Sequence, residues 1–169
     1  MTLEATSQAN GSGVVEGYAS EPRPLGGYAT LSGAFGAAFA AFMVAANRRD
    51  RIPEGVNAGD LVLVGVATHK LSRLISKDIV TSFARAPFTR FKEETGKGEV
   101  EEEARGEGLR RAIGELVACP YCMGQWVAAG LTAGLVFAPR STRLVAGMYT
   151  ALTVSDFLQI AYKAAEERA

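Results

Sequence analysis

The chain has 169 residues, the size of one domain, and its 18 Lys and Arg residues are balanced by 18 Asp and Glu residues. A zero net charge argues against a nucleic-acid-binding protein, which would carry a basic excess on one face. Two closely spaced cysteines do not make the disulfide framework of a small secreted protein. Charged residues are unevenly distributed along the chain, and this segregation guides the prediction of its elements.

The first 27 residues predict a disordered tail, because they are rich in Gly, Ser, Glu and Pro and have no basic segment before an apolar core. No charged residue then occurs between Arg23 and Arg48. The centre of this stretch, residues 28–46, is long enough for a membrane-spanning helix, which needs about 20 apolar residues. The alternative is a buried helix of a soluble protein.

A second helix is expected over about residues 59–80. One broad face is apolar, and the other carries a basic stripe made of His69, Lys70, Arg73 and Lys77. Only residues 61–68 are free of charge, which is too short to cross a bilayer. The helix either lies at the membrane interface with its stripe toward phosphates or spans with the stripe inside the bundle. We favour the interfacial interpretation.

Residues 81–112 predict a charged, mobile cytoplasmic loop, because the segment is rich in Gly and Glu and interleaves Phe with Arg and Lys. Two further spans are expected at residues 123–138 and 144–162, joined by a loop short enough to make them antiparallel. Counting Lys and Arg near the spans places the charged loop and the cysteines on the cytoplasmic side.

The Cys119-Pro-Tyr-Cys122 box admits three interpretations. The favoured one is a helix start with two small buried thiols. The second is thiol redox chemistry, in which Cys119 at a helix N-terminus attacks and Cys122 resolves the mixed disulfide. This use normally requires a βαβ arrangement, for which we find no convincing strand. The third is a metal site formed by both cysteines from each of two subunits, because one chain alone leaves zinc short of ligands.

Asp156 is predicted to lie inside the last span, where a carboxylate is costly and normally finds a partner. His69, Lys70 and Arg73 are the candidate partners, and an ion pair would hold two helices together. A proton or ion path is a weaker alternative, since no second acidic residue accompanies Asp156 in a span. His69 itself is most simply a solvated or headgroup-facing cation.

Four segments resemble a bacterial membrane-protein family catalogued as domain of unknown function 1360, which includes a sporulation protein. They are VATHKLSRLISKD at 66–78, RAPFTRF at 85–91, GELVACPYCMGQWVA at 114–128 and SDFLQIAY at 155–162. The similarity covers roughly residues 57–163. It implies an integral membrane protein of a bacterium or its phage and brings no established activity.

These observations together predict an all-α membrane protein with a helical domain over residues 28–169. We expect about three spanning helices and one amphipathic interfacial, or fourth spanning, helix. The favoured function is a non-enzymatic scaffold without a cofactor that docks a protein partner through residues 83–111. The alternatives are a membrane thiol redox protein and a cysteine-based metal site in a homo-oligomer; no nucleic-acid partner is expected.

Overall fold

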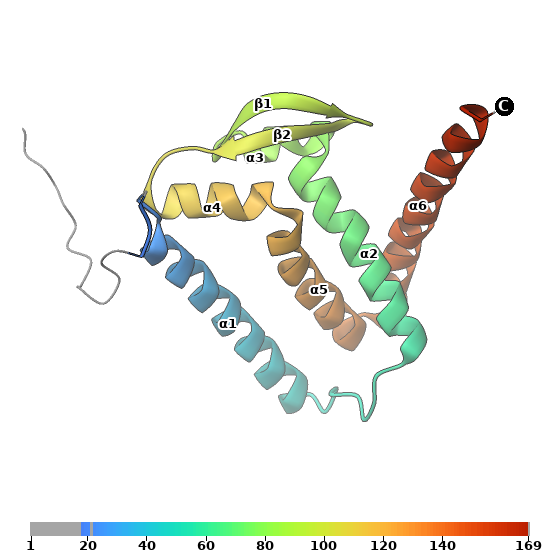
Figure 1. The fold of residues 1–169 in the computed structure, drawn as a ribbon. Helices are drawn as coiled ribbons and strands as arrows, with labels where there is room; N and C mark the ends of the chain where they lie inside the picture. Colours follow the sequence, from blue (N-terminus) through green and yellow to red (C-terminus); the bar gives the residue numbers. More distant parts are fainter. Residues whose placement is uncertain (1–17, 21, 169) are drawn as a thin grey trace, which may run out of the picture.

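The computed structural model describes residues 18–20 and 22–168 (Figure 1). Most of the predicted disordered tail lies outside these residues. The elements, in chain order, are helix α1 (Leu25–Arg48), helix α2 (Ala58–Lys77), a 3-10 turn η1 (Ile79–Thr81), the short helix α3 (Ser82–Arg85), strands β1 (Thr89–Gly96) and β2 (Glu99–Ala104), and helices α4 (Gly108–Ala118), α5 (Pro120–Phe137) and α6 (Pro139–Glu166). Helix α1 therefore begins three residues before the predicted start of the helical domain.

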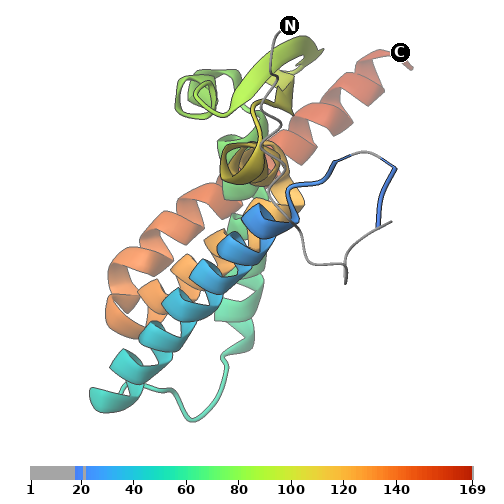
Figure 2. The same cartoon turned by 90° about the vertical axis from the view of Figure 1, so that its left-hand side faces the viewer.

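The four long helices form the body of the molecule, and the shorter elements lie across one end of it (Figures 1 and 2). Helix α2 is central and packs against both α5 and α6, whereas α1 packs against α4 and α5. Successive long helices run in opposite directions. Both described ends of the chain therefore lie at the same end of the body as the shorter elements.

Two described helices, α1 and α6, are long and apolar enough to cross a membrane by length and composition. They correspond to two of the three predicted spans. The third, α5, is uncharged over its 18 residues but does not meet the same standard. Three spans are therefore not shown, and helix α2 does not pass this test either.

The prediction of a mobile loop over residues 81–112 is wrong, and so is the strictly all-α fold class. An antiparallel hairpin occupies residues 89–104, and helices flank it on both sides. Lys97 and Gly98 form a two-residue connection with positive φ at both positions, a turn whose twist suits a hairpin. Sequence reasoning missed the hairpin because β1 is largely polar and glutamates dominate β2, and Glu is depleted in strands.

Close backbone contacts join α4 to its neighbours. A Cβ on Gly114 would lie 2.9 Å from the Cβ of Ala104 in β2, and one on Gly27 would lie 2.6 Å from the Cβ of Ala112. Only glycine fits at either point, so α4 lies directly against both the hairpin and the first turn of α1. We call residues 78–118, which comprise η1, α3, the hairpin and α4, the polar layer.

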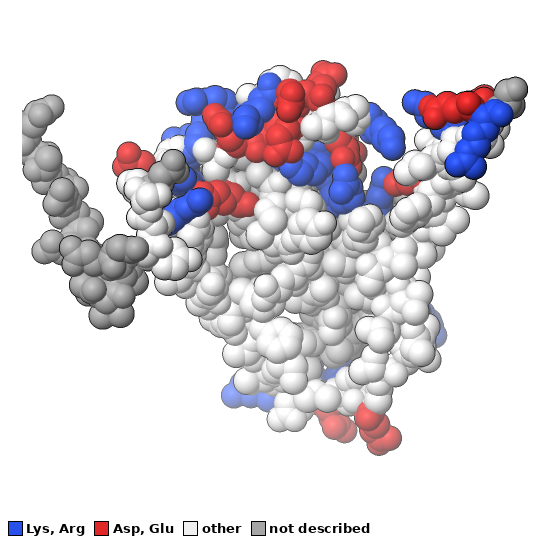
Figure 3. All heavy atoms as spheres, viewed as in Figure 1, with Lys and Arg blue, Asp and Glu red and all other residues white. Residues whose placement is uncertain are grey.

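Charged side chains are concentrated at the two ends of the body, and the face between them is nearly free of them (Figure 3). The uncharged segments of the four long helices, residues 25–47, 61–68, 120–137 and 144–155, make up this zone, which we call the apolar band. Few of its residues are buried by the protein itself. Only 6% of the most apolar window of α1 and 11% of that of α6 are buried.

Candidate functional site

A buried ion pair between Arg85 and Glu102 organises the polar layer. The side chains are 2% and 5% exposed, and Arg85 Nε donates to Glu102 Oε2 at 2.7 Å. Glu102 also accepts a hydrogen bond from the hydroxyl of Thr89 at 2.9 Å. A buried charge is costly unless a partner and further hydrogen bonds compensate it, and both are present here.

The remaining donors of Arg85 bind oxygens at the end of α2 and in the turn that follows. Nη1 donates to the Ile75 carbonyl and the Thr81 hydroxyl, and Nη2 donates to the Asp78 carbonyl, at 2.6 to 3.0 Å. The last carbonyls of a helix have no intrahelical partners and carry partial negative charge, so a guanidinium stabilises them. Arg85 thereby fixes the end of α2 to strand β2.

Two cations of the basic stripe of α2 are neutralised by strand β2. Arg73 pairs with Glu99, and Lys77 Nζ lies 2.6 Å from Glu101 Oε2. Two residues four apart on a helix are separated by about 6 Å, and two residues on the same face of a strand by about 6.7 Å. The spacing of the two cations therefore matches the spacing of the two carboxylates, and the hairpin lies along the end of α2.

Asp156 pairs with Lys70, one of its three candidate partners on α2. Lys70 Nζ lies 2.6 Å from Asp156 Oδ2, with the two side chains 25% and 47% exposed. The pair joins α2 to α6, which also meet where the Thr150 hydroxyl donates to the Leu63 carbonyl. His69 is exposed and belongs to none of the ion pairs among the described residues.

The two cysteines lie where α4 gives way to α5. Cys119 is the N-cap of α5, and its Sγ accepts a hydrogen bond from the backbone N–H of Cys122 at 3.2 Å. Pro120 occupies the first turn, where its missing N–H costs nothing. Both cysteines are free thiols, and the prediction that they are buried is wrong, because Cys119 is partly exposed and Cys122 is exposed. No group of three metal-ligating side chains occurs among the described residues, so His69 does not join the cysteines.

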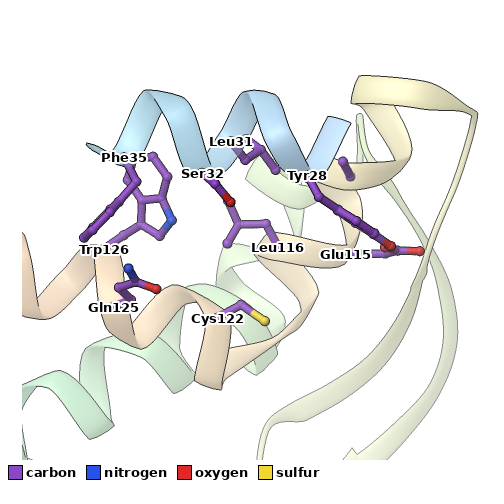
Figure 4. Close-up of a pocket in the computed structure, with 10 residues that line it drawn as sticks. Tyr28, Leu31, Ser32, Phe35, Glu115, Leu116, Cys122, Gln125 and Trp126 are labelled. Atoms are coloured by element: carbon purple, nitrogen blue, oxygen red, sulfur yellow. The ribbon is translucent and has the colours of Figure 1, made fainter. Parts of the chain in front are cut away.

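A cavity of about 470 Å³ lies between α1, α4 and α5, next to the cysteine turn (Figure 4). At one side the Tyr28 hydroxyl donates to Glu115, which also accepts from Arg111 Nε at 3.1 Å. At the other side the rings of Phe35 and Trp126 meet edge to face, 5.2 Å apart. The cavity lies between α1 and the rest of the body. Helix α1 contacts the body mainly through α4 and through aromatic rings that meet α5.

Sequence reasoning singled out the cations of α2 and Asp156 but missed their carboxylate partners on β2 and the role of Arg85. A signal for the strands was present. Gly96-Lys97-Gly98 separates two runs in which large or β-branched residues alternate with charges, as in Glu99-Val100-Glu101. A high glutamate content is typical of a solvated loop, but the glutamates of β2 neutralise Arg73, Lys77 and Arg85.

Comparisons with known proteins agree with the resemblance found in the sequence. The family described as "Protein of unknown function (DUF1360)" matches residues 63–162. The sporulation protein YjcA of Bacillus subtilis (strain 168) is 36% identical over 76 residues, which is 43% of this chain and 64% of the relative. The chain thus spans less than two thirds of the length of the curated relative it matches. No solved structure matches the chain.

Proposed function

Because this chain belongs to the DUF1360 family of proteins of unknown function, we propose from its structure that it is a multi-pass membrane protein whose polar layer docks a cytosolic partner. The observation that carries the proposal is the apolar band between two charged ends (Figure 3). Large exposed apolar surfaces are rare on soluble monomers. On the α6 part of the band alone, Leu144 is 77% exposed and Val154 53% exposed.

Four spanning helices account for the band better than three. All four long helices extend from one charged end to the other, and α5, with 18 residues, is about 27 Å long. Helix α2 is about 30 Å long, and its first turn lies at the far end of the body, where Asp60 accepts two hydrogen bonds from Arg143 at 2.7 and 2.8 Å. An interfacial helix would not place its first turn there. We therefore propose the spanning alternative for α2.

The distribution of basic residues supports one orientation of the proposed spans. Arg48, Arg49, Arg51, Arg140 and Arg143 are the only five of the 18 Lys and Arg residues at the far end. Cytoplasmic segments near spans carry the excess of Lys and Arg. The polar layer, the cysteine turn and both described chain ends then face the cytoplasm, and the loop of residues 49–57 faces outward.

Exposed apolar side chains on the polar layer support a docking role. Val80 is 69% exposed, Phe83 78% and Phe91 58%, on η1, α3 and β1 respectively. Exposed aromatic residues are enriched where proteins bind one another. No observation favours an enzymatic role, because the thiol of Cys119 serves as a helix cap and no third metal ligand lies near either cysteine in the described part of the chain.

Reporter fusions test the topology. A reporter active only outside the cytoplasm, inserted within residues 52–56, should be active, and the same reporter inserted at Lys97 should be inactive. A cytoplasmic reporter should give the reverse result at each position. Equal cytoplasmic signals at both positions would show that α2 does not span and would refute the four-span arrangement.

Complementation of a chromosomal deletion tests the docking role. Phe83→Ser combined with Phe91→Ser should abolish function at normal protein level, whereas Cys119→Ser combined with Cys122→Ser should leave it intact. The opposite pattern would favour the thiol redox alternative. Equal protein levels, measured in the membrane fraction, control for unfolding of either variant.

A further inference from the structure

Two arginines of the polar layer converge on one neutral oxygen. Arg105 Nε donates to the Pro87 carbonyl at 3.3 Å, and Arg110 donates to the same carbonyl from Nε at 3.0 Å and from Nη2 at 2.7 Å. Both guanidinium groups therefore lie within 3.3 Å of a single atom. Like charges this close repel each other unless an anion lies between them or beside them.

No carboxylate neutralises this pair among the described residues. The cations that face the hairpin, Arg73, Lys77 and Arg85, each have an acidic partner. Arg105 and Arg110 are both exposed, and neither takes part in an ion pair in the described part of the chain. Glu107, which lies between them in sequence, makes no capping hydrogen bond in α4 and no ion pair with either arginine.

The loop geometry holds the two arginines together. Gly106 has a φ of +82°, and a Cβ there would lie 2.9 Å from Cδ of Arg110. A side chain at position 106 would therefore displace the Arg110 side chain from the Pro87 carbonyl. Because a guanidinium has five donors, Arg105 and Arg110 retain unused N–H groups after binding that carbonyl. Paired guanidiniums with free donors are suited to a phosphate group.

The arginine pair lies at the depth of lipid headgroups if the apolar band spans the membrane, so this step rests on the proposed function. A Cβ on Gly27 would be 3.0 Å from the carbonyl oxygen of Gly108, so the start of α4 touches the first turn of α1. Arg111 also donates to the Pro22 carbonyl, just before α1, at 3.2 Å. The headgroup region adds only about 5–7 Å on each side of the hydrocarbon.

We infer that Arg105 and Arg110 form a binding site for the phosphate of an anionic lipid in the cytoplasmic leaflet. The basic stripe on α2 is unsuited to this task because its cations are already paired with Glu99, Glu101 and Asp156. The site also lies beside the contact between α1 and α4. A bound lipid would therefore stabilise the attachment of α1, which lies outside the family match.

Native mass spectrometry of the full-length protein in detergent micelles tests the site. The probes are dioleoylphosphatidylglycerol, dioleoylphosphatidylcholine and inorganic phosphate. A basic residue near an anionic surface contributes roughly a fivefold preference. The preference of the wild-type protein for phosphatidylglycerol over phosphatidylcholine should fall about fivefold in Arg105→Gln and more than tenfold in Arg105→Gln with Arg110→Gln.

The matched control is Lys92→Gln with Lys97→Gln, which removes two cations from the exposed hairpin of the same polar layer. It should retain the wild-type preference. Equal losses in the control and in the arginine variants would overturn the site in favour of diffuse charge attraction, as would a wild-type protein without any preference. Displacement of phosphatidylglycerol by millimolar inorganic phosphate would overturn a lipid site in favour of one for free phosphate.

Two further measurements separate these outcomes from misfolding and from failure of the membrane assignment. Arg105→Gln removes a single long hydrogen bond, so its melting temperature should match that of the wild-type protein. Resistance of the wild-type protein to carbonate extraction tests membrane integration independently. A protein that resists extraction but lacks the lipid preference would refute this inference alone.

Discussion

Replacing Glu102 by Gln should destabilise the polar layer far more than the same change at the adjacent Glu103. Gln has the size of Glu but no charge, so Glu102→Gln leaves the guanidinium of Arg85, 2% exposed, without a counter-ion. Arg85 keeps its three hydrogen bonds to uncharged acceptors, the carbonyls of Ile75 and Asp78 and the hydroxyl of Thr81. Removing one partner of a buried pair typically costs about 3–5 kcal/mol.

Glu103 is the matched control because its pair with Arg90 is loose and exposed. The two groups are 3.7 Å apart, with side chains 71% and 47% exposed. An exposed pair of this kind contributes about 0–1 kcal/mol. The two variants change the same functional group one residue apart on β2, so net charge and strand composition are held constant between them.

Hydrogen exchange of the β2 amides, followed by mass spectrometry in detergent, measures the local stability directly. Each 1.4 kcal/mol lost from the free energy of local opening speeds exchange about tenfold. A loss of about 3–5 kcal/mol in Glu102→Gln should therefore speed exchange of the β2 amides roughly 100- to 4,000-fold, or to the unprotected rate if the hairpin opens completely. Glu103→Gln should change exchange by roughly fivefold or less. Exchange rates within threefold of each other in the two variants would refute the role assigned to the Arg85–Glu102 pair.

Substitutions at three further sites test the packing. Gly114→Ala should lower the melting temperature by several degrees, because its Cβ would lie 2.9 Å from the Cβ of Ala104. Gly33→Ala, which has open space around it, should leave the melting temperature unchanged. Equal shifts in the two variants would contradict the close packing of α4. Cys119→Ser should keep the melting temperature because Ser also caps helices, and Cys119→Ala should cost about 0.5–1 kcal/mol; a loss in both would indicate that the thiol has another role. Asp156→Asn should weaken α2–α6 packing by at least about 1 kcal/mol in thermal unfolding, because it leaves Lys70 without its counter-ion; an unchanged transition would show that the pair is dispensable.

The long helices could be predicted from the sequence because each has a simple local signal. Uncharged stretches delimit α1 and α5 to within three residues. Helix α6 begins at Pro139, five residues before the predicted start of its span at residue 144, because the predicted loop 139–143 is its first turn, where Pro is well tolerated. The hairpin could not be predicted from the same kind of signal. Its stability comes from ion pairs between Glu99, Glu101 and Glu102 and cations that lie 17 to 26 residues earlier. Such pairs depend on the tertiary arrangement, and without them the segment has the composition of a solvated loop.

The partner of Asp156 was predictable only as one of three residues, because the choice depends on how far α6 is shifted along α2. The structure fixes this register by a second pair, Asp60 with Arg143, at the other end of the same two helices. Residues 60 and 70 are separated by about 15 Å along α2, and residues 143 and 156 by about 20 Å along α6. Two helices that cross at an angle can satisfy both pairs despite this difference in length.

In the proposed four-span arrangement, the depth of the Lys70–Asp156 pair accounts for a spanning α2 despite its basic stripe. Lys77, whose partner Glu101 lies in the polar layer, is seven residues further along α2, or about 10 Å. Lys70 and Asp156 therefore lie about 10 Å from the polar layer, on the side of the apolar band. A charge at that depth in a membrane is tolerated when it is paired. Each cation that α2 would carry into or beside the membrane has its own carboxylate, so the charge-free length of 61–68 underestimates the length of α2 that lipid can accommodate.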